Sequence, residues 1–412
     1  MPNRTLTIAT EGGSPFNGYL SLPRSGRGPG LILGQEIFGV NPWMRRMADL
    51  YAEEGYVVLV PDLFWRLEPG VELGYSGADR EKAFELYQRF DADQAVRDIA
   101  TAMQALRTLP ECDGGIGFVG FCLGGSLAYL AAARLDLDVA VGYYGVGIER
   151  HLDEAAAITC PLLLHLAGQD SYTPADVVTK IDAAFLARPN LRLHLYPDAN
   201  HGFAAEERDS YHRSATSIAY SRTLAALRGA IGPHYDLEAI WDQHLACEFA
   251  TKDHAAALET MVERPYVNHI PTLTGGTGRD DLARFYKYHF IPRNCPDTNM
   301  VPISRTVGVD KIVDEFLFCF THTQEVDWLL PGVAPTGKPV ELPMIAIVNF
   351  RGDLICHEHI YWDQASALVQ VGALNPTGLP VAGREAAAKV LDENQPSNAM
   401  ISAWPRTLQK PD

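Results

Sequence analysis

A cysteine between glycines gives the sequence its clearest chemical signal. The run IGFVGFCLGGSLAYL at residues 116–130 predicts a strand that ends in GFCLG at residues 120–124 and continues directly into an apolar helix. Glycines on both sides of Cys122 allow a strained turn in which neighbouring β-carbons would collide. The turn places the thiol over the N-terminus of the helix, where the helix dipole and unpaired N–H groups favour the thiolate. Cys122 is therefore a candidate nucleophile.

An attacking thiol needs a general base and an acid that orients the base. Asp170 follows a predicted strand at residues 161–166, and His201 follows another at residues 191–196. Both side chains should leave the carboxyl edge of one sheet. The order Cys122, Asp170, His201 is the nucleophile–acid–base order of the α/β-hydrolase fold. These residues therefore predict a Cys-His-Asp catalytic triad.

Four other residues are weaker candidates for these roles. Asp198 also follows the strand before His201 and is an alternative acid. His165 and His194 lie inside predicted strands, where a core histidine is the ordinary expectation. Cys160 precedes a proline on an apolar strand, so we expect a buried, unreactive thiol there.

The elements that must position these residues alternate between strand and helix. Apolar, β-branched runs predict strands at residues 30–33, 56–60, 116–120, 139–144, 161–166 and 191–196. Helical patterns lie between them at residues 43–54, 93–108, 123–135, 174–186 and 214–227. Strands that are apolar on both faces, each followed by an amphipathic helix, indicate a parallel sheet covered on both sides. The predicted class of this region is α/β.

Composition and charge exclude several classes of protein. The chain has 412 residues, 47% hydrophobic and 21% charged, as in a folded protein of two or three domains. Its formal net charge of −17 disfavours nucleic acid and anionic membranes as partners. Seven cysteines without a CxxC pair favour unpaired thiols in a reducing compartment. Because the N-terminus lacks an apolar signal segment and no apolar run reaches the roughly 18 residues of a membrane span, we expect a cytoplasmic protein.

Residues 1–230 resemble the dienelactone hydrolase (carboxymethylenebutenolidase) family, cysteine hydrolases that open an unsaturated lactone. The resemblance lies in the segments GQEIFGVN (34–41), YVVLVPDLF (56–64), REKAF (80–84), GFCLGG (120–125), VGYYGVG (141–147), AGQD (167–170) and NHGF (200–203). It implies an α/β-hydrolase sandwich that hydrolyses a small-molecule ester or lactone through a thioester acyl-enzyme. It implies no organic cofactor and no metal.

The resemblance also implies roles for residues around the nucleophile. The backbone N–H groups of Ile37 and Leu123 would form the oxyanion hole. Glu36 would keep the resting thiol of Cys122 neutral and accept its proton when an anionic substrate arrives. The alternative for Glu36 is a buried salt bridge at the edge of the sheet.

Further family positions predict how the substrate is bound. Arg80 matches an arginine that binds the substrate carboxylate; the alternative is an ordinary solvated arginine. Tyr143 matches a pocket residue near the oxyanion. Phe84 and Tyr87 stand where the family has an aromatic lining.

The sequence departs from the family pattern after the histidine. The family run His-Ser-Phe-Ala-Arg is HGFAA at residues 201–205, so Gly202 replaces the serine and Ala205 replaces the second carboxylate-binding arginine. Arg208 follows three residues later, but the sequence does not show that it reaches the pocket. We therefore expect only a modest preference for anionic over neutral lactones.

A second domain begins after residues 228–236 (RGAIGPHYD), where two glycines and a proline end the preceding helix. Helices are predicted at residues 237–249, 254–261 and 280–290, followed by strands at 300–307, 311–322, 342–350 and 354–362. This order indicates an α+β domain at residues 236–375. The Pro-rich tail at residues 376–412, with one helical stretch at 384–391, is expected to be an arm packed on it.

The second domain resembles the SnoaL-like branch of the NTF2-like fold, a cone of curved sheet closed by helices. The similarity lies in THTQEVDWLLPGVAPTGKPVELP (321–343) and GDLICHEHIYWDQASALVQVG (352–372). Such domains include cyclases, isomerases and dehydratases as well as modules for binding and dimerisation, so two alternatives stay open. The domain performs the main chemical step of a bifunctional protein, or it serves only for binding and dimerisation.

Polar residues at one end of the cone are candidates for a pocket: His269, His322, Glu358 and Asp363. Strand alternation places His357 and His359 on one face and Glu358 on the other. Two histidines without a third ligand at suitable spacing do not predict a metal site.

The strand at residues 342–350 predicts an oligomer. Its apolar residues fall on both faces, with Ile345 and Ile347 on one and Met344, Ala346 and Val348 on the other. If one face lines the cone, the other needs a cover. We expect a homodimer formed mainly through residues 236–375, because two-fold dimers are the commonest oligomers.

Overall fold

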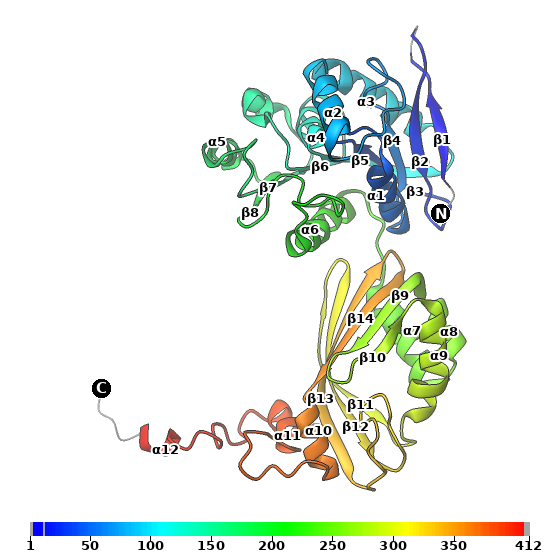
Figure 1. The fold of residues 1–412 in the computed structure, drawn as a ribbon. Coiled ribbons are helices and arrows are strands. Elements are labelled where there is room, and N and C mark those ends of the chain that lie inside the picture. The colour runs from blue at the N-terminus through cyan, green and yellow to red at the C-terminus, as the bar shows by residue number, and fades with distance from the viewer. Residues whose placement is uncertain (1–2, 11–12, 408–412) are drawn as a thin grey trace. The chain divides into compact units, whose positions relative to one another are not determined.

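The computed structural model describes residues 3–10 and 13–407 of the chain. The chain divides into two compact units, Met1–His234 and Tyr235–Asp412 (Figure 1). The division falls inside the segment at residues 228–236 that the sequence marks as a break. None of the helices in the described ranges is long and apolar enough to cross a membrane.

The first unit is built on an eight-stranded sheet with the order β1-β2-β4-β3-β5-β6-β7-β8. Its strands are β1 (Asn3–Ile8), β2 (Phe16–Ser21), β3 (Gly28–Gly34), β4 (Val57–Pro61), β5 (Cys112–Phe121), β6 (Val139–Tyr143), β7 (Leu162–Ala167) and β8 (Leu191–Tyr196). Its helices are α1 (Pro42–Glu53), α2 (Gly77–Gln88), α3 (Ala92–Arg107), α4 (Leu123–Arg134), η1 (Ile148–Ala157), α5 (Ala175–Phe185) and α6 (Arg213–Ile231). Strands β3 to β8 pair in parallel, while β1 and β2 are antiparallel.

Helices cover both faces of this sheet, with α1 and α6 on one side and α3 and α4 on the other (Figure 1). Every residue of β3, β4, β6 and β7 is buried, as the continuous apolar runs predicted. The first unit therefore has an α/β-hydrolase-like fold, and the six strands and five helices predicted for it are confirmed.

Four elements of the first unit were not predicted: β1, β2, α2 and η1. Strands β1 and β2 lie at one side of the sheet, where β1 is mostly exposed and lacks a continuous apolar run. Asn17 and Gly18 inside β2 are a typical hairpin-turn pair. Helix α2 buries only Ala83 and Leu86, so its sequence shows little helical periodicity.

The parallel strands bring the candidate residues to one edge of the sheet. Strands β3, β5, β7 and β8 run in the same direction, so their carboxyl ends lie together. Glu36 follows β3, Cys122 follows β5, Asp170 follows β7 and His201 follows β8. Four segments that are far apart in sequence thus meet at this edge.

Helix α6 anchors the loop that contains His201. The carbonyl of Phe203 accepts the backbone N–H of His212 at 3.0 Å and the hydroxyl of Thr216 at 2.8 Å. At the other end of α6, Arg228 Nη2 lies 2.6 Å from Oε2 of Glu54, which follows α1, and both side chains are buried. Because buried charges must be paired, this contact fixes α6 on the sheet.

The second unit contains a six-stranded sheet with the order β10-β9-β14-β13-β12-β11. Its strands are β9 (Met261–His269), β10 (Thr274–Thr277), β11 (Asn299–Val307), β12 (Lys311–Thr321), β13 (Pro339–Arg351) and β14 (Leu354–Trp362). Its helices are α7 (Leu237–Leu245), η2 (Ala246–Ala250), α8 (His254–Glu259), α9 (Arg279–Phe285), η3 (Tyr286–Phe290), η4 (Ile291–Arg293), α10 (Gln364–Val371), α11 (Glu385–Leu391) and α12 (Trp404–Thr407). Only β9 and β14 among the neighbouring pairs are parallel.

One face of this sheet packs on helices α7 to α9, and the opposite face of β13 and β14 is more open (Figure 1). Met344, Ala346 and Val348 are buried, whereas Ile345 on the other face is 40% exposed and Tyr361 is 38% exposed. The predicted alternation along β13 is therefore present. Strands β9 and β10 were not predicted, because Met261 begins β9 where the sequence suggests the end of a helix.

Candidate active site

The nucleophile elbow lies between β5 and α4. Cys122 precedes the first residue of α4 with φ 55° and ψ −110°, a strained backbone for a residue with a side chain. A Cβ on Gly120 would overlap the carbonyl oxygen of Gly124, and a Cβ on Gly124 would overlap the carbonyl of Gly34. Glycine is therefore required on both sides of the cysteine, because the clashing atoms belong to the backbone.

Replacement of Gly124 by alanine is expected to destabilise the first unit. The added methyl group would press on the backbone of β3, and overpacking of this kind typically costs about 1–3 kcal/mol. Thermal unfolding should show a lower melting temperature. The matched control is Gly229→Ala in α6, where a Cβ meets no atom within 4 Å. An unchanged melting temperature for Gly124→Ala would contradict this account of the elbow.

The side chains of Cys122, His201 and Asp170 form a continuous hydrogen-bonded relay. Nε2 of His201 lies 3.2 Å from Sγ of Cys122, and Nδ1 lies 2.8 Å from Oδ2 of Asp170. The other carboxylate oxygen accepts the backbone N–H of Tyr172 at 2.8 Å. A carboxylate at Nδ1 keeps a proton on that nitrogen and orients Nε2 toward the sulfur. Asp170 is thus the carboxylate partner of His201, whereas Asp198 is exposed.

The environment of His201 favours its charged form. Burial acts to lower the pKa of the imidazole, but the interactions with Cys122 and Asp170 outweigh burial and raise the pKa to about 10. The largest influence that raises this pKa is the charge of Cys122, so the imidazolium is favoured when Cys122 is a thiolate. The imidazolium stands beside the sulfur as a proton donor and as a countercharge for that thiolate.

The other cysteine and histidines considered above lie in the core. Burial raises the pKa of the Cys160 thiol to about 11, which keeps it protonated and unreactive. His165 is buried between the hydroxyls of Thr223 and Tyr196, at 3.1 and 2.9 Å, and burial holds its pKa well below the ordinary value. His194 stacks on His165, and partial burial lowers its pKa as well.

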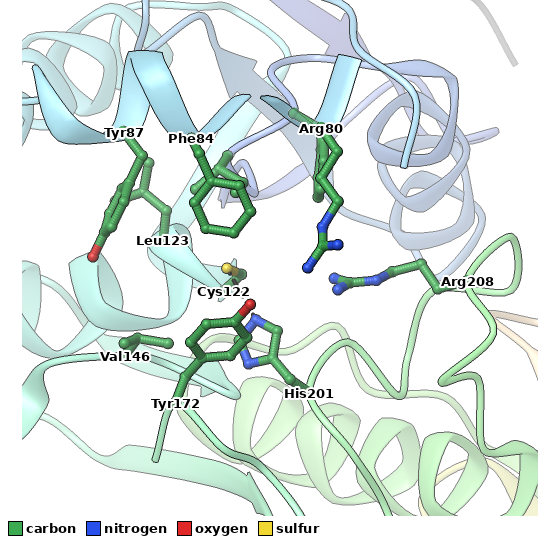
Figure 2. Close-up of a pocket in the computed structure, with 11 residues that line it drawn as sticks. Arg80, Phe84, Tyr87, Cys122, Leu123, Val146, Tyr172, His201 and Arg208 are labelled. Atoms are coloured by element: carbon green, nitrogen blue, oxygen red, sulfur yellow. Dashed lines mark hydrogen bonds between the residues drawn. The ribbon is translucent and has the colours of Figure 1, made fainter. Parts of the chain in front are cut away.

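A pocket of about 550 Å³ opens over the relay (Figure 2). Figure 2 shows Cys122 between Phe84, which comes from α2, and His201. The pocket is mostly apolar, with two arginines at one end, and is lined by Ile37, Phe38, Arg80, Phe84, Tyr87, Cys122, Leu123, Val146, Tyr172, His201 and Arg208. Arg80, Phe84 and Tyr87 are thus all part of the pocket wall.

The two proposed oxyanion-hole residues flank the nucleophile. Ile37 follows β3 and Leu123 begins α4, and both line the pocket. At the first position of a helix, the N–H of Leu123 has no carbonyl within the helix to bind. The N–H of Gly124 donates to the carbonyl of Gln35 at 2.9 Å, which holds the two segments together.

Tyr143 does not lie where the family resemblance implies, and the next residue is the one beside the relay. Tyr143 is buried, with its hydroxyl 2.6 Å from Oγ1 of Thr223, and it does not line the pocket. Tyr144 has φ 38° and packs edge-on against His201 with ring centroids 5.1 Å apart. Tyr172 also packs against His201, at 4.9 Å. The position of Tyr172 two residues after Asp170, in the segment AGQDSY, was the sequence signal that could have identified it.

Arg208 reaches the pocket, which the sequence could not show. Figure 2 shows its guanidinium and that of Arg80 directed toward the same space. Gly202 has φ 81°, and a Cβ there would lie 2.6 Å from Nε of Arg208 and closer still to the rest of the guanidinium. Gly202, which replaces the family serine, therefore leaves room for the guanidinium of Arg208. The family's second arginine is absent here, because position 205 is an alanine.

Glu36 is buried and paired with this arginine. Nη1 of Arg208 lies 3.1 Å from Oε1 of Glu36. Burial raises the pKa of the Glu36 carboxyl, and the charge of Arg208 opposes that rise. The buried salt bridge considered as the alternative for Glu36 is therefore present. The sulfur of Cys122 instead forms a hydrogen bond with Nε2 of His201.

The second unit contains a cavity of about 450 Å³ that includes His269 and Glu358 among its lining residues. Two of the four residues predicted for this pocket lie elsewhere. His322 follows β12 in a turn, with Nδ1 3.2 Å from Oγ1 of Thr336. Asp363 is exposed and caps α10 by accepting the N–H of Ala365.

His244 and Glu248, which also belong to the cavity's polar cluster, were not predicted from the sequence. Their spacing of four residues on one helical segment was the available signal. On the opposite face of the sheet, Nε2 of His357 lies 2.9 Å from Nε2 of His359. Within the described ranges, no group of three or more His, Cys, Asp or Glu side chains could hold a metal ion.

Comparison with known proteins places this geometry in a family. The family model described as dienelactone hydrolase matches residues 16–230. A carboxymethylenebutenolidase of Pseudomonas sp. (strain P51) is 39% identical over 224 residues, covering 54% of this chain and 94% of that protein. A carboxymethylenebutenolidase of Pseudomonas putida is 38% identical over 220 residues, covering 53% and 93%. The crystal structure of dienelactone hydrolase from Anabaena variabilis is 18% identical, covers 56% of this chain and 99% of its own, and has a TM-score of 0.42. With its cysteine elbow, histidine and carboxylate all inside the matched region, the chain belongs to the dienelactone hydrolase family.

Proposed function

We propose that this chain hydrolyses a carboxylated ester or lactone through a thioester formed on Cys122. Relatives at 39% identity are carboxymethylenebutenolidases, so the chain is a hydrolase that acts on esters or lactones. The relay of Cys122, His201 and Asp170 at the carboxyl edge of the sheet is the observation that most directly supports this mechanism.

The proposed reaction uses the relay twice. The thiolate of Cys122 attacks the carbonyl carbon, and the N–H groups of Ile37 and Leu123 stabilise the resulting oxyanion. The intermediate collapses when the leaving alkoxide oxygen takes a proton from Nε2 of His201, and a thioester remains. Neutral His201, oriented by Asp170, then removes a proton from a water molecule that attacks the thioester. Collapse of this second intermediate releases the carboxylic acid and restores the thiolate.

The two arginines favour an anionic substrate. Arg80 and Arg208 are directed toward the same space beside Cys122, and a carboxylate could accept hydrogen bonds from both. We therefore propose that Arg208 supplies the second cation that Ala205 cannot. This replaces the modest preference expected from the sequence with a pronounced preference for carboxylated substrates.

A substrate carboxylate would also change the state of Glu36. It would compete with Glu36 for Arg208, whose Nη1 lies 3.1 Å from the glutamate. The charge of Arg208 opposes the rise in the pKa of Glu36 that burial causes, so loss of this countercharge makes Glu36 a stronger proton acceptor. We propose that Glu36 then takes the proton of the Cys122 thiol and so couples substrate binding to thiolate formation.

Replacement of Arg208 by alanine is expected to reduce the selectivity for charge. Loss of a charge-assisted hydrogen bond typically costs about 1.5–3 kcal/mol, so kcat/KM for a carboxylated γ-lactone should fall about 10- to 100-fold. The primary amide of the same lactone should be affected much less. The matched control is Arg192→Ala, which removes an exposed arginine on β8. Equal losses for the two substrates would contradict the assignment.

Gly202→Ser provides a second test that keeps the charge of Arg208. The added side chain would displace the flexible guanidinium and would also strain the left-handed backbone at position 202 by about 1–3 kcal/mol, so the melting temperature of the variant is measured beside its activity. We expect the same loss of charge selectivity as in Arg208→Ala. Full selectivity in Gly202→Ser would show that Arg208 does not bind the substrate carboxylate.

For the second unit, we propose an NTF2-like cone that pairs with a second copy through its open sheet face. Exposed Ile345 and Tyr361 support a cover on that face. We further propose a cytoplasmic location, because none of the seven cysteines forms a disulfide among the described residues. Light scattering on the intact chain tests the dimer, which a monomeric mass would contradict.

A further inference from the structure

The second unit contains a cavity that the hydrolase chemistry does not use. The empty space within it, including its opening to solvent, is about 450 Å³, and it lies outside the residues matched by the family model. Aromatic side chains form much of its wall: Trp241, Phe249, Tyr286, Phe290, Phe316, Phe318 and Trp328. Walls of this kind fit the flat faces of a ring-containing molecule.

Ionisable side chains are buried at the wall of this cavity. Nε2 of His244 lies 3.1 Å from Oε1 of Glu248 and 3.4 Å from Oε1 of Glu358. Nδ1 of the same histidine lies 2.6 Å from Oγ1 of Thr260. Two carboxylates thus face one imidazole in an apolar core. Apolar residues of similar volume would stabilise such a core equally well or better, so a cluster of this kind favours a functional role.

Glu358 is the member of the cluster whose carboxylate has an oxygen without a hydrogen-bond partner among the described residues. Its side chain is only 4% exposed, it lines the cavity, and no residue that the structure describes makes a hydrogen bond to its Oε1. Burial raises the pKa of this carboxyl to about 7, although His244 opposes the rise and Glu248 adds to it. At neutral pH the carboxyl can therefore either accept or donate a hydrogen bond.

The remaining polar groups facing the cavity disfavour a negatively charged ligand. Glu248 comes from η2, and Tyr286 from η3 stays neutral because burial raises its pKa well above the ordinary value. His269 lies on β9, beside Ile360 of β14 in register, and burial lowers its pKa to about 3. His244, which lies behind the lining carboxylates, already faces two of them among the described residues.

We propose that this cavity is a second ligand site, which binds a neutral, ring-containing molecule with a phenolic or enolic hydroxyl. The ring lies against the aromatic wall, and the hydroxyl donates a hydrogen bond to Oε1 of Glu358. His244 and Glu248 position that carboxylate. This site is independent of the reaction at Cys122, and the proposed function can fail without affecting it.

Calorimetric titration of the full chain with 2-naphthol and with 2-naphthoate tests the proposal. The two probes share one ring system and differ in charge, so we expect 2-naphthol to bind at least tenfold more tightly. Its affinity should rise between pH 6 and pH 8, because the ionised carboxylate of Glu358 accepts a stronger hydrogen bond than the neutral acid. Equal or tighter binding of 2-naphthoate would overturn the proposal.

Three variants locate the binding. Glu358→Gln should weaken 2-naphthol binding about tenfold and remove its pH dependence, while Glu315→Gln on the other face of the sheet should change neither. Ala346→Phe should abolish binding by filling the cavity that Ala346 lines. All three should keep full ester hydrolysis and an unchanged far-ultraviolet circular dichroism spectrum. Retained affinity for 2-naphthol in Ala346→Phe would overturn the proposal, whether or not the Glu358→Gln variant folds.

Discussion

Replacement of Cys122 by alanine is expected to abolish the hydrolysis of esters and lactones. In the proposed mechanism the thiolate forms the covalent bond to the acyl group, and no other cysteine and no serine or threonine lines the pocket among the described residues. Removal of the nucleophile in a comparable relay lowers kcat by roughly 10⁶-fold. We expect a loss of at least about 10⁴-fold in kcat, measured as lactone hydrolysis at saturating substrate.

The matched control for this variant is Cys160→Ala, which removes a buried thiol just before β7 and should leave kcat nearly unchanged. Cys122→Ser should be far weaker than the parent. The elbow and the imidazolium of His201 stabilise a thiolate at neutral pH, whereas a hydroxyl stays protonated. Substantial activity in Cys122→Ala would refute the proposed mechanism.

Replacement of Asp170 by asparagine is expected to have the second-largest effect on catalysis. Its Oδ2 lies 2.8 Å from Nδ1 of His201 and keeps the proton on that nitrogen. An amide group there could donate a hydrogen bond to Nδ1, so the proton would move to Nε2 and the base would face the sulfur in the wrong tautomer. The equivalent change in a serine hydrolase lowers kcat about 10⁴-fold, and we expect a loss of about 10³- to 10⁴-fold.

The size of the loss in kcat distinguishes a positioning role of Asp170 from a purely structural one. Asp198→Asn is the matched control, because Asp198 is exposed and follows the same strand as His201. It should retain parental kcat. Circular dichroism and the melting temperature show whether Asp170→Asn stays folded. A folded Asp170→Asn variant with near-parental kcat would mean that the carboxylate does not control the tautomer of His201.

The sequence predicts the first unit well because short, local patterns of apolar residues identify its strands and helices. Strands buried on both faces appear as unbroken apolar runs, and their parallel pairing fixes which ends meet. The relay could therefore be assigned from three residues, each directly after a strand. Strand β2 escapes prediction although four of its six residues are buried, because Asn17 and Gly18 inside it resemble a turn. Gly18 is needed there for packing. A Cβ at Gly18 would press on Leu59 and the backbone of Val60.

Contacts between segments that are distant in sequence could not be predicted in the same way. Arg208 enters the pocket because the chain turns after His201 through a left-handed Gly202, and the sequence does not give the direction of that turn. Tyr143 and Tyr144 are both buried, and a positive φ at Tyr144 breaks the alternation that would have told them apart.

The second unit shows the same limit. Glu358 was expected in a pocket because strand alternation separates it from the flanking histidines. Its ionic partner His244 lies on a helix at the start of the unit. Pairing of a helix with a particular strand depends on how the sheet curves, which a pattern of hydrophobic residues does not specify.

The contact between Gly202 and Arg208 restricts the order in which this pocket could have arisen by mutation. A side chain at position 202 and the guanidinium of Arg208 would occupy the same volume, so the two cannot coexist while Arg208 keeps this conformation. If Arg208 binds the substrate as proposed, an arginine at position 208 gives no benefit until position 202 is glycine. With Ala205 in place of the family arginine, a serine at position 202 would then leave the pocket with one cation. On this proposal, the effects of substitutions at positions 202, 205 and 208 depend on one another.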